Sequence, residues 1–177
     1  MKPLPSGYYL RLQLLGLPIL VHWTAPAVGA GVAFMGIVMH GPLTFVVSLW
    51  LAAFAVVVIH ELGHAMAGRI VGAEVVGIVL TGVGGLCLMK LVTPLSASRR
   101  LLVDAGGWCA QALLFALTLL ASRPWGTPGT PVIESLTFLA LVSTNLIMFV
   151  CSAIPTGEND GAKVLSLLRT MFRHRAG

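Results

Sequence analysis

The stretch "VVVIHELGHAMAG", residues 56–68, decides the fold, because it places two histidines and a glutamate at the end of a long apolar run. Charged and metal-binding side chains are expensive in an apolar environment unless a partner compensates them. Positions i and i+4 of a helix share a face, so His60 and His64 can direct their imidazole nitrogens to one ion. The stretch therefore predicts a membrane helix that carries a metal site.

The composition around this stretch is that of a membrane protein. Hydrophobic residues make up 57% of the chain and charged residues 10%, whereas soluble domains average about 25% charged. The net charge of +5 comes from Lys and Arg near the ends of apolar runs. There is no basic stripe with interleaved aromatics, so we expect no nucleic acid partner. The three cysteines lie far apart in apolar surroundings and are interpreted as small buried hydrophobes.

Long apolar segments predict the fold class, an all-α membrane protein with about four transmembrane helices. A bilayer-crossing helix needs about 20 residues. We place the spans at 23–39, 43–67, 101–121 and 132–154. Residues 1–177 are expected to form a single domain, with a lead-in segment at 1–22 and an Asp-Gly segment and basic tail at 155–177.

The linker between the second and third spans has its own pattern. Residues 73–92 contain two aliphatic runs around "TGVGG", which predicts a short β-hairpin or a re-entrant loop. A plain surface loop fits the pattern equally well. An open strand edge cannot face lipid, so a hairpin here must lie at the interface or line a cavity. Residues 10–21 are expected to form a cytoplasmic or interfacial lead-in, with a strand as an option.

Lys and Arg positions predict the orientation. They precede the first span, lie between the second and third, and follow the fourth, while Arg123 alone is on the opposite side. The positive-inside rule then places both termini and the long linker in the cytoplasm. We expect an integral, multi-pass protein of the plasma membrane, with the lipid bilayer as its surroundings.

The residues "HELGH" fit the H-E-x-x-H pattern, in which the glutamate acts as general base on a water held by zinc. Glu61 is that glutamate. Metzincins would require Gly at 67 and His at 70, and the chain has Ala67 and Ile70, so that class is excluded. Two histidines do not complete a catalytic zinc site, which usually has three protein ligands. His22 and His40 flank the first span and are interpreted as interfacial residues rather than ligands.

Asp160 is the predicted third ligand. It follows the fourth span, and the topology brings that end to the same side as the histidine pair. Pro155 and Gly157 break the helix and let a carboxylate turn inward. The alternative is that Asp160 caps a helix beginning near Ala162. Asp104, at the start of the third span, is interpreted as interfacial. The expected cofactor is one Zn²⁺ per chain.

Together these motifs resemble the site-2 protease family of intramembrane zinc metalloproteases. That family pairs H-E-x-x-H in one span with an Asp-Gly in a later one, often as L-D-G after N-x-x-P, and "HELGH" and "IPTGENDG" occupy those places. "LRLQLLGLPILVHWT" resembles the family's first strand and first span, "TGVGG" its Gly-Gly hairpin, and "AGGWCAQ" its Gly-x-x-x-Asn/Gln helix. The likeness covers nearly the whole chain. Asn159 replaces the usual Leu and Ala162 a second Gly.

The resemblance implies hydrolysis of peptide bonds in or near the transmembrane segment of a membrane protein substrate. Zinc would be held by His60, His64 and Asp160, with Glu61 as base. A substrate helix has its carbonyls in hydrogen bonds, so it must unwind before attack. Residues 73–92 would hold the unwound strand by edge pairing.

Five further residues are predicted to position the substrate. Gly84 and Gly85 would allow close backbone approach. Gln111 would face inward, either toward the substrate or in a hydrogen bond between helices. Counting back from the proline of "IPTG", the family's Asn falls on Ser152, with Asn145 seven residues earlier on the same helix face. Either could donate to a developing oxyanion.

Two other classes of function stay open on the sequence. A zinc-binding membrane protein without protease activity, such as a transporter or scaffold, would share the metal ligands. A transporter should offer further intramembrane carboxylates or histidines along a pathway. A structural subunit would need neither the metal nor the base.

Overall fold

The computed structural model of the chain describes residues 7–27, 34, 38, 43–82, 84–91, 93–121, 132–157 and 159–173. This part is mostly helical, with one four-stranded sheet. Most of the predicted first span, 23–39, and His40 lie outside it, so both expectations stay predictions.

The sheet contains more of the chain than the sequence predicts. It is built, in the order β1-β2-β3-β4, from Tyr9–Leu14, Leu17–His22, Glu74–Thr81 and Gly84–Lys90. The hairpin β3–β4 is antiparallel, which confirms the hairpin option for residues 73–92. β2 pairs parallel to β3, so the lead-in joins the same sheet. The prediction of an all-α fold is therefore wrong in this respect.

The turn between β1 and β2 explains why these strands were hard to foresee. Leu14 pairs with Leu17, so Leu15 and Gly16 form a two-residue loop. Both have positive φ, at 51° and 73°, as a type I′ hairpin turn requires. Asn-Gly or Asp-Gly usually mark such turns, and Leu-Gly carries a weaker signal. The parallel pairing with β3 joins segments that are far apart in the sequence, and no local pattern reports it.

The structure describes four long helices. Three of them, α2, α3 and α4, span Leu43–Ile70, Ala97–Ala121 and Val132–Ala153 and match the predicted spans at 43–67, 101–121 and 132–154, whereas α5, Asp160–Arg173, lies in the predicted Asp-Gly segment and basic tail. Two of them, α2 and α3, are long and apolar enough to cross a membrane, and α4 contributes a shorter apolar stretch, Phe138–Ala153. The number of four spans is not established by these helices and stays a prediction.

The end of α2 is set by a glycine. The N–H of Gly72 donates to the carbonyl of Arg69 at 3.1 Å, and the N–H of Ala73 donates to that of Gly68 at 2.9 Å. These are the two hydrogen bonds of a Schellman cap, with Gly72 in the left-handed conformation at φ 87°. The chain therefore leaves the helix directly into β3.

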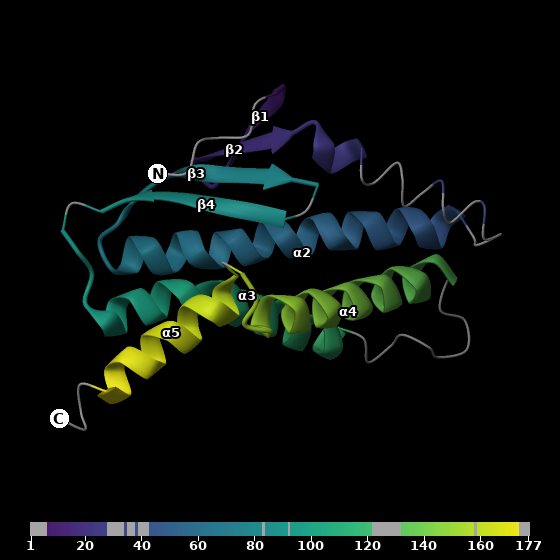
Figure 1. Cartoon of the computed structure of the whole chain (residues 1–177). Coiled ribbons are helices and arrows are strands. Elements are labelled where there is room, and N and C mark those ends of the chain that lie inside the picture. Colours follow the sequence, from purple (N-terminus) through teal and green to yellow (C-terminus); the bar gives the residue numbers. More distant parts are fainter. Residues whose placement is uncertain are drawn as a thin grey trace.

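The sheet packs on one side of α2, and α3 and α4 pack on the other, as Figure 1 shows. The core between β2, β3 and α2 is apolar, with Leu17, Ile19, Ala65, Ile78 and Leu80 at its centre. α5 follows α4 and contacts α3 as well. Helix α2, which carries the H-E-x-x-H residues, thus lies at the middle of the fold.

The contact between α2 and α3 depends on two glycines. A Cβ atom at Gly106 would lie 2.6 Å from the carbonyl oxygen of Gly63, and one at Gly63 would collide with the carbonyl oxygen of Gly106. Small residues let helix backbones approach closely in this way. The histidine-bearing turn of α2 is therefore held directly against α3.

We expect Gly63→Ala to lower the thermal unfolding midpoint of the full chain in detergent. Helix propensity alone predicts stabilisation by about 1 kcal/mol, whereas overpacking against a backbone carbonyl destabilises by about 1–3 kcal/mol. Met66→Ala, on the same helix at a side chain that is 52% exposed, is the control with a small expected shift. A Gly63→Ala protein as stable as the original would show that the helices are not this tightly packed.

Candidate metal centre

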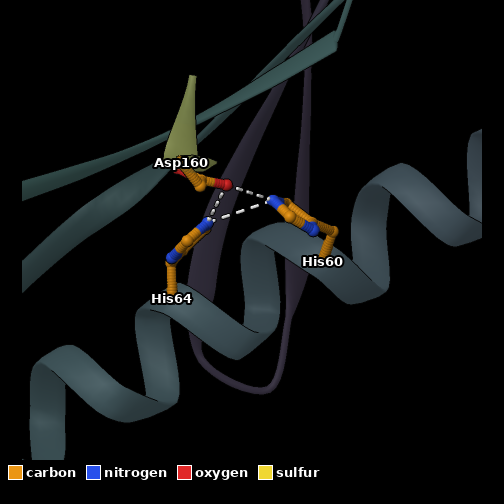
Figure 2. A group of neighbouring side chains, drawn as sticks. All are labelled: His60, His64 and Asp160. Atoms are coloured by element: carbon orange, nitrogen blue, oxygen red, sulfur yellow. Dashed lines mark hydrogen bonds and ion pairs between the residues drawn. The ribbon is translucent and has the colours of Figure 1, made fainter. Parts of the chain in front are cut away.

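Three ligand atoms from two helices meet at one point (Figure 2). His60 and His64 are one turn apart on α2, and Asp160 is the first residue of α5. Asp160 Oδ2 lies 2.8 Å from His60 Nε2 and 3.1 Å from His64 Nε2, and the two Nε2 atoms are 3.1 Å apart. Ligands bonded to tetrahedral zinc at about 2.0–2.1 Å lie about 3.3 Å from one another. The spacing and the nitrogen and oxygen donors suit such an ion.

Asn159 places the carboxylate. Its Oδ1 accepts a hydrogen bond from the N–H of Ala162 at 3.0 Å, which makes Asn159 the N-cap of α5. Its Nδ2 donates to the carbonyls of Cys151 and Ile154 at the end of α4. The structure therefore excludes the alternative in which Asp160 is the cap. The residue that departs from the family's Leu performs that role and leaves Asp160 to face the histidines.

The second ring nitrogen of each histidine is held by α3. His64 Nδ1 lies 2.7 Å from the carbonyl oxygen of Val103. Because a carbonyl only accepts, Nδ1 carries a proton, and Nε2 is the ring nitrogen that would bind an ion. His60 Nδ1 lies 3.0 Å from Gln111 Oε1 in the same way. Gln111, 1% exposed, thus orients a ligand, and its role toward a substrate stays a prediction.

A glycine on α3 makes room for the His60 ring. A Cβ atom at Gly107 would lie 2.6 Å from His60 Nε2 and would strike the rest of the ring. Any larger residue would turn the imidazole away from Asp160. The space for the ligand is therefore built into α3.

The centre is buried and electrostatically compensated. His60, His64 and Asp160 are 8%, 7% and 7% exposed. Burial acts to raise the pKa of the Asp160 carboxyl, but hydrogen bonds to His60 and His64 outweigh it, with a further contribution from Lys163, and the pKa lies well below its usual range. Lys163 Nζ is 2.9 Å from Asp160 Oδ1. The carboxylate is thus available as an anionic ligand.

A cavity of about 690 Å³ opens beside the ligands. It gathers eight of the nine residues predicted for the site. These are His60, Glu61, His64, Gly84, Gly85, Gln111, Ser152 and Asp160. Glu61 is 6% exposed, and a Cβ atom at Gly85 would lie 2.7 Å from its carboxyl carbon. Strand β4 therefore packs directly on the predicted base.

The two candidates for the family's Asn differ in position. Asn145 is 2% exposed, does not line the cavity, and donates from Nδ2 to the backbone carbonyl of Gln111 at 3.1 Å. Ser152 lines the cavity. Its hydroxyl accepts from Trp108 Nε1 and donates to the Phe149 carbonyl, both at 3.0 Å. Both groups already have partners within the protein, and oxyanion binding by either stays a prediction.

Two charged residues of the cavity were missed on the sequence. Asp104, interpreted as interfacial, lines the cavity, and its side chain is 13% exposed with Arg100 Nε at 3.9 Å. It shares a face of α3 with Gly107 and Gln111, a spacing of three and seven residues that could have revealed it. Lys163 stands three residues after Asp160, the spacing of neighbours on a helix.

Cys87 also lines the cavity without joining the ligands. Burial, with the nearby Glu61 carboxylate as a second cause, raises the pKa of its thiol to about 12. A thiolate is the form that binds metals. Cys87 therefore acts as an uncharged wall residue. Of the described His, Cys, Asp and Glu residues, the group with suitable spacing for an ion is His60, His64 and Asp160.

Buried histidines at i and i+4, an aspartate from a later helix and an adjacent buried glutamate are the features of an H-E-x-x-H metal-site protein. The sequence is 26% identical over 162 residues to a zinc metalloprotease of Methanocaldococcus jannaschii, across 90% of this chain and 45% of the relative. The chain thus spans about half the length of that relative.

The fold is similar to that of a solved site-2 protease from Methanocaldococcus jannaschii, with a TM-score of 0.67 and 23% identity over 93% of this chain and 73% of that one. No model of a protein family matches the chain. Both similarities support the resemblance to the site-2 protease family that the sequence motifs indicate.

We expect Asp160→Asn to reduce the divalent metal bound by the purified full chain from one ion per chain to well below one. A neutral amide oxygen is a poor substitute for a carboxylate ligand on zinc. Asp104→Asn removes a carboxylate that lines the same cavity outside the ligand group, and it should leave the metal content unchanged. Elemental analysis after dialysis measures both. Equal metal loss in the two variants would contradict the assignment of ligands.

Proposed function

We propose that the chain is a zinc-dependent intramembrane endopeptidase that cleaves peptide bonds in or near the transmembrane segment of membrane protein substrates. The observation that carries this proposal is the meeting of His60 Nε2, His64 Nε2 and Asp160 Oδ2 in a cavity that also contains Glu61. The names of the similar proteins agree with it.

Zinc is the ion that this donor set favours, with two imidazole nitrogens and one carboxylate oxygen. When bound, it supplies Lewis acidity and lowers the pKa of a coordinated water to about 7. The residues His60, His64 and Asp160 would hold one ion per chain. Hydrogen bonds from the outer ring nitrogens of the histidines to α3, and from Lys163 Nζ to Asp160 Oδ1, keep the ligand atoms in place.

Glu61 serves as the general base and acid. It takes a proton from the water as the water oxygen bonds to the carbonyl carbon, and the C=O π electrons move onto the carbonyl oxygen. It then delivers that proton to the amide nitrogen, and the C–N bond breaks as the carbonyl re-forms. Its carboxylate is confined between α2 and β4, because Gly85 allows the strand to lie against it. Confinement keeps the base at a fixed position beside the ligands.

Strand β4 supplies a surface for the unwound substrate. Among the described strands it lies at an edge of the sheet, and Gly84, Gly85, Leu86, Cys87 and Met89 line the cavity. An extended segment that adds to this edge would satisfy its exposed backbone groups through β4 and run past Glu61. This supports the predicted positioning role of Gly84 and Gly85.

The surface of the helices supports a bilayer location. Large apolar side chains on α3 and α4 are exposed, among them Leu113, Leu117, Leu120, Leu146 and Ile147. Water penalises such a surface, whereas lipid does not. With the distribution of Lys and Arg, this leads us to propose a multi-pass protein of the plasma membrane whose termini face the cytoplasm.

We expect Glu61→Gln to keep one zinc ion per chain and to slow cleavage by about 10²–10⁴-fold, the contribution of a positioned general base. The full chain is reconstituted with a set of single-span membrane proteins, products are identified by mass spectrometry, and zinc is measured on the same samples. His64→Ala should lose both zinc and cleavage.

The same experiment separates the alternatives. A zinc-binding scaffold or transporter would bind zinc without producing fragments from any substrate of the set, and a transporter would move zinc into vesicles. Fragments produced by Glu61→Gln at the original rate would remove Glu61 from the mechanism. A structural subunit would bind no zinc in the unaltered protein.

We expect Gly85→Ala to lower the cleavage rate by about a hundredfold with zinc content unchanged. The added methyl would displace the Glu61 carboxylate, and a displacement of about 1 Å in a catalytic group has an effect of that size. Leu88→Ala, on the same strand but outside the cavity lining, is the control. An unchanged rate in Gly85→Ala would mean that β4 does not constrain the base.

A further inference from the structure

Lys163 is a charged side chain in direct contact with a predicted metal ligand, and the proposed reaction uses it only to hold Asp160 in place. Its Nζ lies 2.9 Å from Asp160 Oδ1. Oδ2 of the same carboxylate is 2.8 Å from His60 Nε2 and 3.1 Å from His64 Nε2. The Asp160 carboxylate therefore lies between the Lys163 ammonium group and the two histidines.

Lys163 is a partly exposed residue of the cavity wall. Its side chain is 42% exposed and lines the cavity together with Glu61. An ammonium group has three N–H donors, and Asp160 Oδ1 accepts one hydrogen bond from it. The remaining donors can reach a group that enters the cavity. Lys163 can therefore donate a hydrogen bond to a second group in addition to its ion pair with Asp160.

Hydrolysis of a peptide places negative charge on the attacked carbonyl oxygen, and a hydrolase needs donors directed at that oxygen. The two residues predicted for this role have other partners. Asn145 is buried away from the cavity and donates to the Gln111 backbone. The Ser152 hydroxyl donates to the Phe149 carbonyl. Lys163 brings both a positive charge and N–H donors to the cavity wall.

We propose that Lys163 stabilises the negative charge that develops on the carbonyl oxygen of the scissile peptide. Its contact with Asp160 holds the ammonium group beside the metal centre, and its other N–H groups donate to the oxygen as the charge grows. This inference rests on the proposed function, since it assigns a role in that hydrolysis. A different role, an ion pair at i and i+3 that only supports α5, predicts no effect on anions at the centre.

The test uses anion binding and requires no substrate. Co²⁺ replaces the divalent ion in the full chain in detergent, because zinc is spectroscopically silent, and azide is titrated while the visible absorption of the cobalt is followed. We expect Lys163→Met to raise the Kd for azide by at least about tenfold, the effect of losing a charge-assisted hydrogen bond. Lys163→Arg should stay within about twofold to threefold of the original protein.

Arg169→Met is the matched control, since it removes one positive charge from an exposed position of the same helix and should leave the azide Kd unchanged. An unchanged Kd in Lys163→Met, with normal cobalt loading, would overturn the proposal. Loss of cobalt loading in both Lys163→Met and Lys163→Gln would overturn it too, by assigning Lys163 to the positioning of Asp160. Because peptide cleavage is not measured, a failure of the protease proposal would show in the Glu61→Gln experiment and not here.

Discussion

The structure depends on bringing one carboxylate oxygen, Oδ2 of Asp160, to two imidazoles that precede it by about a hundred residues. Burying a carboxylate is strongly unfavourable unless its charge and both oxygens are compensated. Here Oδ2 faces the histidine pair, and Oδ1 accepts a hydrogen bond from the Lys163 ammonium group. Asn159 caps α5, so the helix begins at the residue that carries the charge. The chain between the two motifs must fold before this compensation exists.

Glycines let the neighbours of α2 reach the motif from two sides. His60 and Glu61 are consecutive on the helix and so point in directions about 100° apart. His60 enters the space left by Gly107 of α3, and Glu61 lies against Gly85 of β4. The predicted metal ligand and the proposed base are thus held by different elements. The sheet and the helix pair have separate functions, although both pack on the same two turns of α2.

Local patterns in the sequence predicted what is local in the structure. The spacing of His60 and His64 predicted that they share a helix face. The long apolar runs predicted α2, α3 and α4, with most of their ends correct to within a few residues. Asp160 could be chosen because breaking residues precede it and the topology returns the chain. The parallel pairing of β2 with β3 could not be foreseen, since it joins distant segments and the Leu15-Gly16 turn lacks the usual residues. The hydrogen bond from His64 to a backbone carbonyl of α3 leaves no trace in residue identity.

The cavity wall has an uncharged part and a charged part, and the two come from different elements of the fold. Strand β4 contributes uncharged residues, whereas α3 contributes Asp104 and α5 contributes Asp160 and Lys163. A hydrolase among apolar helices has to admit water and also bind an extended apolar segment. A cavity wall that was polar throughout would bind the segment poorly, and one that was apolar throughout would exclude water. In the proposed reaction the charged side suits water and developing charge, and β4 suits the substrate backbone. Glu61 lies against Gly85 of β4 and lines the same cavity, and in the proposed reaction it would take a proton from the water and deliver it to the substrate.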